Sequence, residues 1–72
     1  MALHQHRRIL GQTIRSYREQ AKLTQEQLAE KADLTPKYLG EVERGLVNIS
    51  VDALVRIGKA LRLRVNDLTR KI

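Results

Sequence analysis

Two helix-start signals stand close together in the middle of the sequence and limit what the chain can fold into. The run 24-TQEQ-27 places a hydroxyl residue three positions before a glutamine, which is the pattern of a capping box. In 35-TP-36, Thr35 can cap free backbone N–H groups, and Pro36 falls at the first helical position, where its missing N–H costs nothing. The signals therefore predict two short helices, over about 24–32 and 35–44, joined by a short turn.

Helical periodicity extends over the rest of the chain. A first amphipathic helix is predicted over about 7–21, where Leu10, Ile14 and Tyr17 recur at spacings of four and three. Ser50 caps a later helix that runs to about residue 62, and a last short helix covers about 66–72. The residues of the Ser50-capped helix expected to face the core are Val51, Leu54, Ile57 and Leu61.

No segment has the pattern of a strand, so the fold class predicted is all-α, a compact bundle of about five short helices. At 72 residues the chain is one domain, 1–72, whose N-terminus over about 1–6 is expected to be flexible. No apolar run approaches the roughly 20 residues that span a bilayer. We therefore expect a cytoplasmic protein with no membrane partner.

The charge of the chain favours a polyanionic partner. Fourteen Lys and Arg residues against eight Asp and Glu residues give a formal net charge of +6. The chain has two tyrosines and no Phe or Trp, whereas proteins that read single strands usually stack bases on aromatic side chains. Composition therefore favours double-stranded DNA over single-stranded nucleic acid.

An enzyme is not expected, because the residues that carry catalysis are missing or isolated. The two histidines, His4 and His6, lie near the N-terminus, and no carboxylate pairs recognisably with Ser16 or Ser50. A His-x-His pair alone is a poor metal site, there is no cysteine, and no glycine-rich phosphate loop is present. The sequence therefore predicts no catalytic residue, no metal and no cofactor.

The two central helices have the spacing of a helix-turn-helix. Small Ala29 would let them approach closely and hold the second helix at a fixed angle, so that its outer side is free to enter a groove. That side carries two neighbouring rows, Pro36–Gly40–Arg44 and Lys37–Glu41–Arg44. The face offers both hydrogen-bond donors and acceptors.

Four runs in order, 13-TIRSYR-18, 23-LTQEQLA-29, 42-VERG-45 and 54-LVRIGKALRL-63, carry a resemblance that covers most of the chain. They are similar to the Xre-type helix-turn-helix family, which includes phage repressors, Cro proteins and the controller proteins of restriction-modification systems. The resemblance implies a lambda repressor-like DNA-binding domain. It also implies a transcriptional regulator that binds a palindromic operator as a homodimer, with the helix at about 35–44 in the major groove.

The resemblance also implies roles for single residues. Gln25 would bond a phosphate and brace the recognition helix, and Arg18 and Glu43 would form a partly buried ion pair between the first and third helices. The other DNA-binding positions implied are Thr35, Pro36 and Lys37 near the base edges, Tyr38 and Glu41 beside them, and Arg44 and Asn48 on the DNA backbone.

Some of these roles have alternatives. Tyr38 could place its phenol on a phosphate or pack its ring beside Val42, and Arg44 could clamp a phosphate or pair with a surface carboxylate. Glu41 could accept from a cytosine amino group or orient an arginine.

The sequence departs from the family pattern at three positions, of which Pro36 and Gly40 affect base reading. Asp33 stands in the turn at a position often held by glycine, Pro36 offers only apolar contact, and Gly40 offers no side chain. Specificity would then depend on Thr35, Lys37, Glu41 or Arg44 and on DNA shape.

The C-terminal segment is richer in apolar residues than one short helix can hide. We expect a dimer interface there, made by Leu63, Val65, Leu68 and Ile72; the alternative is that all of them cover the core of their own monomer. The rival function is that of an antitoxin of the same family, which neutralises a partner toxin and represses its own operon.

Overall fold

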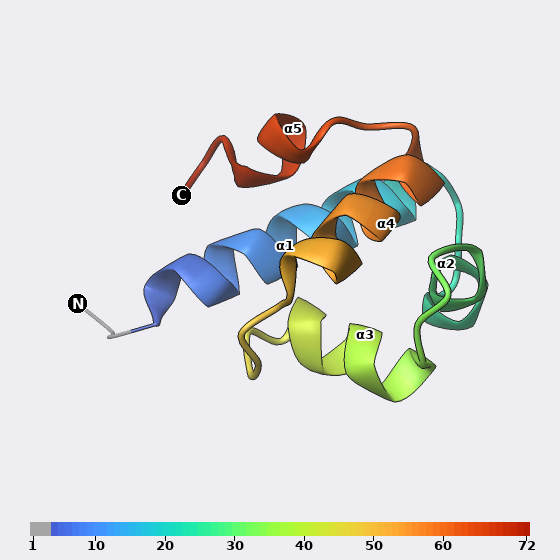
Figure 1. The fold of residues 1–72 in the computed structure, drawn as a ribbon, viewed down its shortest axis with the longest axis horizontal. Coiled ribbons are helices and arrows are strands. Elements are labelled where there is room, and N and C mark those ends of the chain that lie inside the picture. The colour runs from blue at the N-terminus through green and yellow to red at the C-terminus, as the bar shows by residue number, and fades with distance from the viewer. Residues whose placement is uncertain (1–3) are drawn as a thin grey trace.

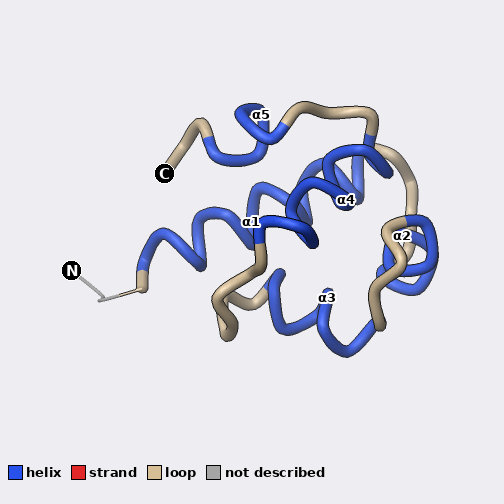
Figure 2. The backbone as a smooth tube through the Cα atoms, viewed as in Figure 1, coloured by secondary structure: helices blue, strands red, loops and turns tan. Residues whose placement is uncertain are grey.

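The computed structural model describes residues 4–72, and every regular element in that part of the chain is a helix (Figure 2). The helices are α1 (Gln5–Gln20), α2 (Gln25–Lys31), α3 (Pro36–Glu43), α4 (Val51–Leu61) and α5 (Val65–Thr69). Figure 1 shows α1 and α4 across the middle of the molecule, α3 on one side of them and α5 on the other, with α2 at one end. The predicted all-α fold with five short helices is confirmed.

The helix starts follow the predicted capping residues. The Thr24 hydroxyl accepts from the Gln27 N–H at 3.0 Å, and the Gln27 side chain accepts from the Thr24 N–H at 2.8 Å, which completes the capping box. Thr35 and Ser50 cap α3 and α4 in the same way, and Pro36 is the first residue of α3. Because each cap is made within one turn of the chain, local sequence was enough to predict it.

Four helices end at a residue in the left-handed conformation, and only one of these residues is glycine. They are Lys22 (φ 60), Asp33 (φ 56), Gly45 (φ 73) and Arg62 (φ 59). After α2, the Leu34 N–H donates to the Ala29 carbonyl at 2.8 Å, the bond that defines a Schellman motif. Gly45 ends α3 as predicted, while the other three ends place a side chain where glycine is favoured.

The core gathers one apolar stripe from each helix. Its buried members are Leu10, Ile14, Leu28, Ala29, Ala32, Leu39, Val42, Ile57 and Leu68. Val51, predicted to face the core, is instead 75% exposed, and Ala53 is buried at 1%. Successive helical residues turn by about 100°, so residues two apart, such as Val51 and Ala53, point to nearly opposite sides.

Helix α1 crosses the C-terminal end of α3 at Gly11. A Cβ atom at Gly11 would lie 2.3 Å from the carbonyl oxygen of Val42 and 2.6 Å from that of Glu43. No side chain fits between these backbones, so the close contact of α1 with α3 depends on this glycine. No sequence pattern predicted this role for Gly11.

The two ends of the chain differ from the predictions. Helix α1 begins at Gln5, so two residues of the segment expected to be flexible are helical, and residues 1–3 lie outside the described part of the chain. Helix α5 covers Val65–Thr69 and not 66–72. Within residues 4–72, no helix is both long and apolar enough to cross a membrane.

Leu68 was wrongly assigned to a dimer interface. Its side chain is fully buried in the core of its own chain, where it packs with the other buried residues, so it is not available to a second copy. Apolar periodicity in a terminal helix cannot distinguish a residue that covers the monomer core from one that binds another subunit.

Candidate nucleic-acid interface

Helices α2 and α3 form the predicted helix-turn-helix. The left-handed residue Asp33 reverses the chain after α2, half-buried Leu34 packs against the core, and Thr35 begins α3. The inner side of α3 is held by Leu39 and Val42, which are 0% and 3% exposed. The opposite side of α3 is therefore directed away from the body of the domain (Figure 1).

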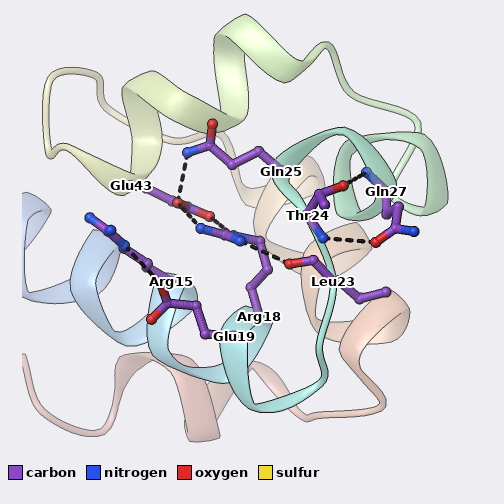
Figure 3. Close-up of polar contacts among 8 residues, drawn as sticks. All are labelled: Arg15, Arg18, Glu19, Leu23, Thr24, Gln25, Gln27 and Glu43. Atoms are coloured by element: carbon purple, nitrogen blue, oxygen red, sulfur yellow. Dashed lines mark hydrogen bonds and ion pairs between the residues drawn. The ribbon is translucent and has the colours of Figure 1, made fainter.

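A buried ion pair fixes the C-terminal end of α3 to α1. The Nε and Nη2 atoms of Arg18 donate to the two carboxylate oxygens of Glu43 at 2.7 and 3.0 Å, and Nη1 donates to the Leu23 carbonyl at 2.8 Å (Figure 3). The two side chains are 10% and 2% exposed. The hydrogen bond to Glu43 raises the pKa of Arg18 above its ordinary value, despite the opposing effect of burial. The ion pair predicted from the resemblance is confirmed.

Gln25 joins α2 to the same carboxylate. Its amide nitrogen donates to Oε1 of Glu43 at 2.9 Å, and Figure 3 shows the side chain reaching from the start of α2 to α3. A Cβ atom at Gly40 would lie 3.7 Å from the Gln25 side-chain oxygen, so the glutamine lies close over this glycine. The predicted bracing of α3 by Gln25 is present, and a second amide hydrogen remains for a phosphate oxygen.

Tyr38 lies between α3 and the start of α4. Its half-buried ring packs against the core, and its phenol oxygen accepts from the Ser50 N–H at 3.2 Å. Of the two alternatives for Tyr38, packing of the ring against the protein is therefore observed. The phenol hydrogen is not used in this bond and can still be donated to a phosphate.

The outward side of α3 carries two exposed cations, whereas Gly40, which was predicted to lie in the outward row, is buried. Pro36, Lys37 and Arg44 are exposed, Glu41 is half-buried, and Asn48 is exposed in the loop that follows. The ion pairs found in residues 4–72 involve neither Lys37 nor Arg44, so the surface ion pair considered for Arg44 is not formed. Both cations are free to meet an anionic partner.

Arg8 brings a further cation to the end of α3, which the sequence analysis missed. A Cβ atom at Gly45 would lie 2.7 Å from Cγ and 2.8 Å from Cα of Arg8, so the first turns of α1 pack directly on Gly45. Arg8 is exposed and lies next to the segment that carries Arg44. Gly45 was interpreted only as a helix end, and no local pattern links it to a residue so distant in the sequence.

The two histidines lie close together at the start of α1. The rings of His4 and His6 lie edge to face at the start of α1, with their centroids 6.1 Å apart. Within the described residues, no group of three His, Cys, Asp or Glu side chains is placed to hold a metal ion.

Comparison with known proteins agrees with this geometry. Residues 14–68 match the model of the helix-turn-helix family HTH_3. The control protein C.SmaI of Serratia marcescens is 43% identical over 60 residues, covering 83% of this chain and 71% of that protein. The immunity repressor of Bacillus phage phi105 is 44% identical over 59 residues, which are 82% of this chain but only 41% of the repressor. The chain belongs to the helix-turn-helix family.

Two solved structures share the fold. The restriction-modification controller protein C.AhdI of Aeromonas hydrophila superposes with a TM-score of 0.84 at 34% identity, over 85% of this chain and 92% of that one. The biofilm regulator SinR, solved in complex with DNA, has a TM-score of 0.79 at 35% identity, over 82% of this chain and 95% of that one. The helix-turn-helix predicted from the sequence is confirmed.

Proposed function

We propose that this chain is a transcriptional regulator that binds double-stranded DNA sequence-specifically, with α3 in the major groove. The observation that carries the proposal is the outward side of α3, where Lys37 and Arg44 are exposed while the opposite side is fixed in the core. A helix held rigidly with cations along its free side fits a groove lined by phosphates. Membership of the helix-turn-helix family supports this function.

The proposed contacts divide by position along the interface. At the start of α3, Thr35, Pro36 and Lys37 would lie nearest the base edges, with Glu41 one turn further on. Gln25, Tyr38, Arg44 and Asn48 would contact phosphates, which position the helix without reading sequence.

The regulator would bind as a homodimer, because one recognition helix covers too few base pairs to be selective. Val65 and Ile72 are 36% and 52% exposed, and Leu63 is half-buried, so these residues remain the proposed interface. The DNA site would then be a palindrome, and the protein would act in the cytoplasm. The relatives described above are named as repressors and controllers, and no observation favours the antitoxin alternative.

Selection of bound DNA from a random duplex library tests the function. The expected result is enrichment of a palindrome whose half-sites lie about one helical turn apart. Failure to enrich any duplex sequence would contradict a sequence-specific regulator. Enrichment of a single, unrepeated half-site would contradict the dimer but not DNA binding.

The Lys37→Ala substitution tests the proposed reading surface. Lys37 is exposed and makes no ion pair, so the variant should keep its helicity while its affinity for the enriched duplex falls. If Lys37 contacts a phosphate, the slope of log affinity against log salt should fall by about 0.9. Lys59→Ala, an exposed lysine on α4, is the matched control for a gel-shift titration. Equal binding by both variants would remove Lys37 from the interface.

A further inference from the structure

The turn between α2 and α3 contains a residue that is poorly suited to its conformation. Asp33 has a φ of 56, in the left-handed region that glycine adopts with less strain. Its carbonyl and carboxylate are not needed to end α2, because the Asp33 and Leu34 N–H groups already bond the carbonyls of Glu30 and Ala29. The end of α2 therefore does not explain why this position carries an aspartate and not a glycine.

Arg56 of α4 contacts this turn through a hydrogen bond and an ion pair. Its Nη1 atom donates to the Asp33 carbonyl at 3.3 Å and lies 3.6 Å from the carboxylate oxygen Oδ2. Arg56 precedes Ile57, which is fully buried, so its backbone is fixed in the core. Among the ion pairs of residues 4–72, only the pair of Arg56 with Asp33 joins α4 to the turn.

We propose that Arg56 is a positioning residue for DNA recognition, which holds the turn through Asp33 and so fixes how the start of α3 is presented to the bases. Two residues after Asp33 comes Thr35, followed by Pro36 and Lys37, the residues proposed to lie nearest the base edges. A shift of the turn would move all three together. The inference rests on the proposed function, because it concerns the accuracy of base reading by the same surface.

Two other roles for Arg56 give different results in binding experiments. A direct phosphate contact would strengthen binding to every duplex and add about 0.9 to the salt slope. A surface ion pair with no effect on the turn would change neither affinity nor selectivity. If Arg56 acts only by positioning, its removal lowers affinity for the correct sequence and leaves both non-specific binding and the salt slope unchanged.

The first experiment compares the duplex enriched by selection with a scrambled duplex of the same length. Arg56→Ala should weaken binding to the enriched duplex about two- to fivefold, the range expected for an exposed pair, and leave the scrambled duplex unaffected. Arg56→Lys retains the charge and should recover part of the loss, while Lys59→Ala on the same helix should change nothing. Equal losses on both duplexes with a lower salt slope, or no loss on either, would overturn the proposal.

The second experiment separates positioning from stability. Asp33→Gly relieves the left-handed strain but removes the carboxylate, so its Tm should rise while selectivity for the enriched duplex falls. Lys22→Gly relieves the same strain at the end of α1, where φ is 60, and should raise Tm without altering selectivity. If Asp33→Gly and Arg56→Ala both retain full selectivity, Asp33 and Arg56 do not position α3; Asp33→Gly alone tests only the carboxylate, because glycine keeps the carbonyl that Arg56 also bonds.

The double variant Asp33→Gly/Arg56→Ala completes the test. Because the Asp33 carboxylate acts through Arg56, the loss of selectivity in the double variant should be smaller than the product of the two single losses. Independent, multiplying effects would overturn the proposal. If the wild-type protein prefers no duplex sequence, the proposed function itself fails, which is a result distinct from normal selectivity in the Arg56 variants.

Discussion

At the scale of single residues, one carboxylate connects three helices. Glu43 of α3 accepts two hydrogen bonds from Arg18 of α1 and one from Gln25 of α2. Burying a charge is unfavourable unless it is paired and hydrogen-bonded, and here both oxygens have partners. The network therefore serves chiefly to fix the direction of α3 relative to the other two helices.

Removing one partner of the Arg18–Glu43 ion pair should lower the free energy of unfolding much more than replacing both partners. Glu43→Ala should lower the free energy of unfolding by about 3–5 kcal/mol, because it leaves the guanidinium of Arg18 buried without its partner. The double variant Arg18→Met/Glu43→Leu should lose far less, since apolar side chains of similar size suit the site. Urea unfolding of both variants measures the difference. Near-equal losses would mean that the pair is not buried in solution.

Residue roles could be predicted where a motif carried them. Arg18, Gln25 and Glu43 were assigned through the quoted runs, and the structure shows the ion pair and the brace. The contact between Arg56 and Asp33 could not be predicted, because it joins α4 to the turn after α2 through two residues that are distant in the sequence and belong to no shared pattern.

At the scale of the helices, two glycines differ in whether the surrounding structure leaves space for a side chain. Gly11 is required, because the Val42 and Glu43 carbonyls leave no space for a side chain between α1 and α3. Gly40 seemed unusual in the sequence, yet a Cβ atom there would meet its nearest neighbour, an Arg44 nitrogen, at 3.5 Å. That is ordinary van der Waals contact, so packing does not explain Gly40.

Alanine at these two positions should therefore shift stability in opposite directions. Gly11→Ala should lower the free energy of unfolding by about 1–3 kcal/mol through overpacking against the backbone. Gly40→Ala should raise it by roughly 1 kcal/mol through better helix propensity. Thermal unfolding followed by circular dichroism compares the two variants. A destabilised Gly40→Ala variant would show that α3 has less space than the structure gives it.

Helix starts were predicted more accurately than helix faces and chain ends. Thr24, Thr35 and Ser50 cap their helices through bonds to residues three positions away, which the sequence displays directly. Whether Val51 or Ala53 faces the core depends on how α4 lies against α2 and α5. That information is tertiary, and a short apolar pattern does not contain it.

At the scale of the whole molecule, the exposed apolar residues decide where a second copy could bind. Val65 and Ile72, near the C-terminus, were proposed from the sequence. The structure adds Leu46 and Val51, which are 63% and 75% exposed and were not assigned to an interface. Exposed apolar residues at two places in the fold mean that the dimer surface must be determined by experiment.

Serine substitution distinguishes these two surfaces. Val65→Ser should shift the monomer–dimer equilibrium towards the monomer, because it removes apolar area from the proposed interface. Val51→Ser, which alters an exposed valine on α4, should leave the equilibrium unchanged. Sedimentation at micromolar concentrations measures both variants. The reverse result would place the interface at the start of α4 and contradict the C-terminal assignment.

The fold class could be predicted because the whole molecule is built from local signals, five helical segments of which three begin at a recognisable capping residue. The close crossing at Gly11 and the packing of Arg8 on Gly45 could not, since both join residues far apart in the chain. The part of the candidate site that lies on α3 was therefore predicted, together with the Arg18–Glu43 pair that links it to α1. The packing of Gly11 and Arg8 of α1 and the contact from α4 were not.

The most direct test of the account asks which groove α3 enters. Dimethyl sulfate methylates guanine N7, an atom exposed in the major groove, and adenine N3, which is exposed in the minor groove. Footprinting of the selected duplex with this reagent should show protection of guanine N7 within each half-site, and Lys37→Ala should weaken that protection at equal protein concentration. Protection confined to adenine N3, with guanine N7 fully reactive in a saturated complex, would contradict major-groove recognition by α3.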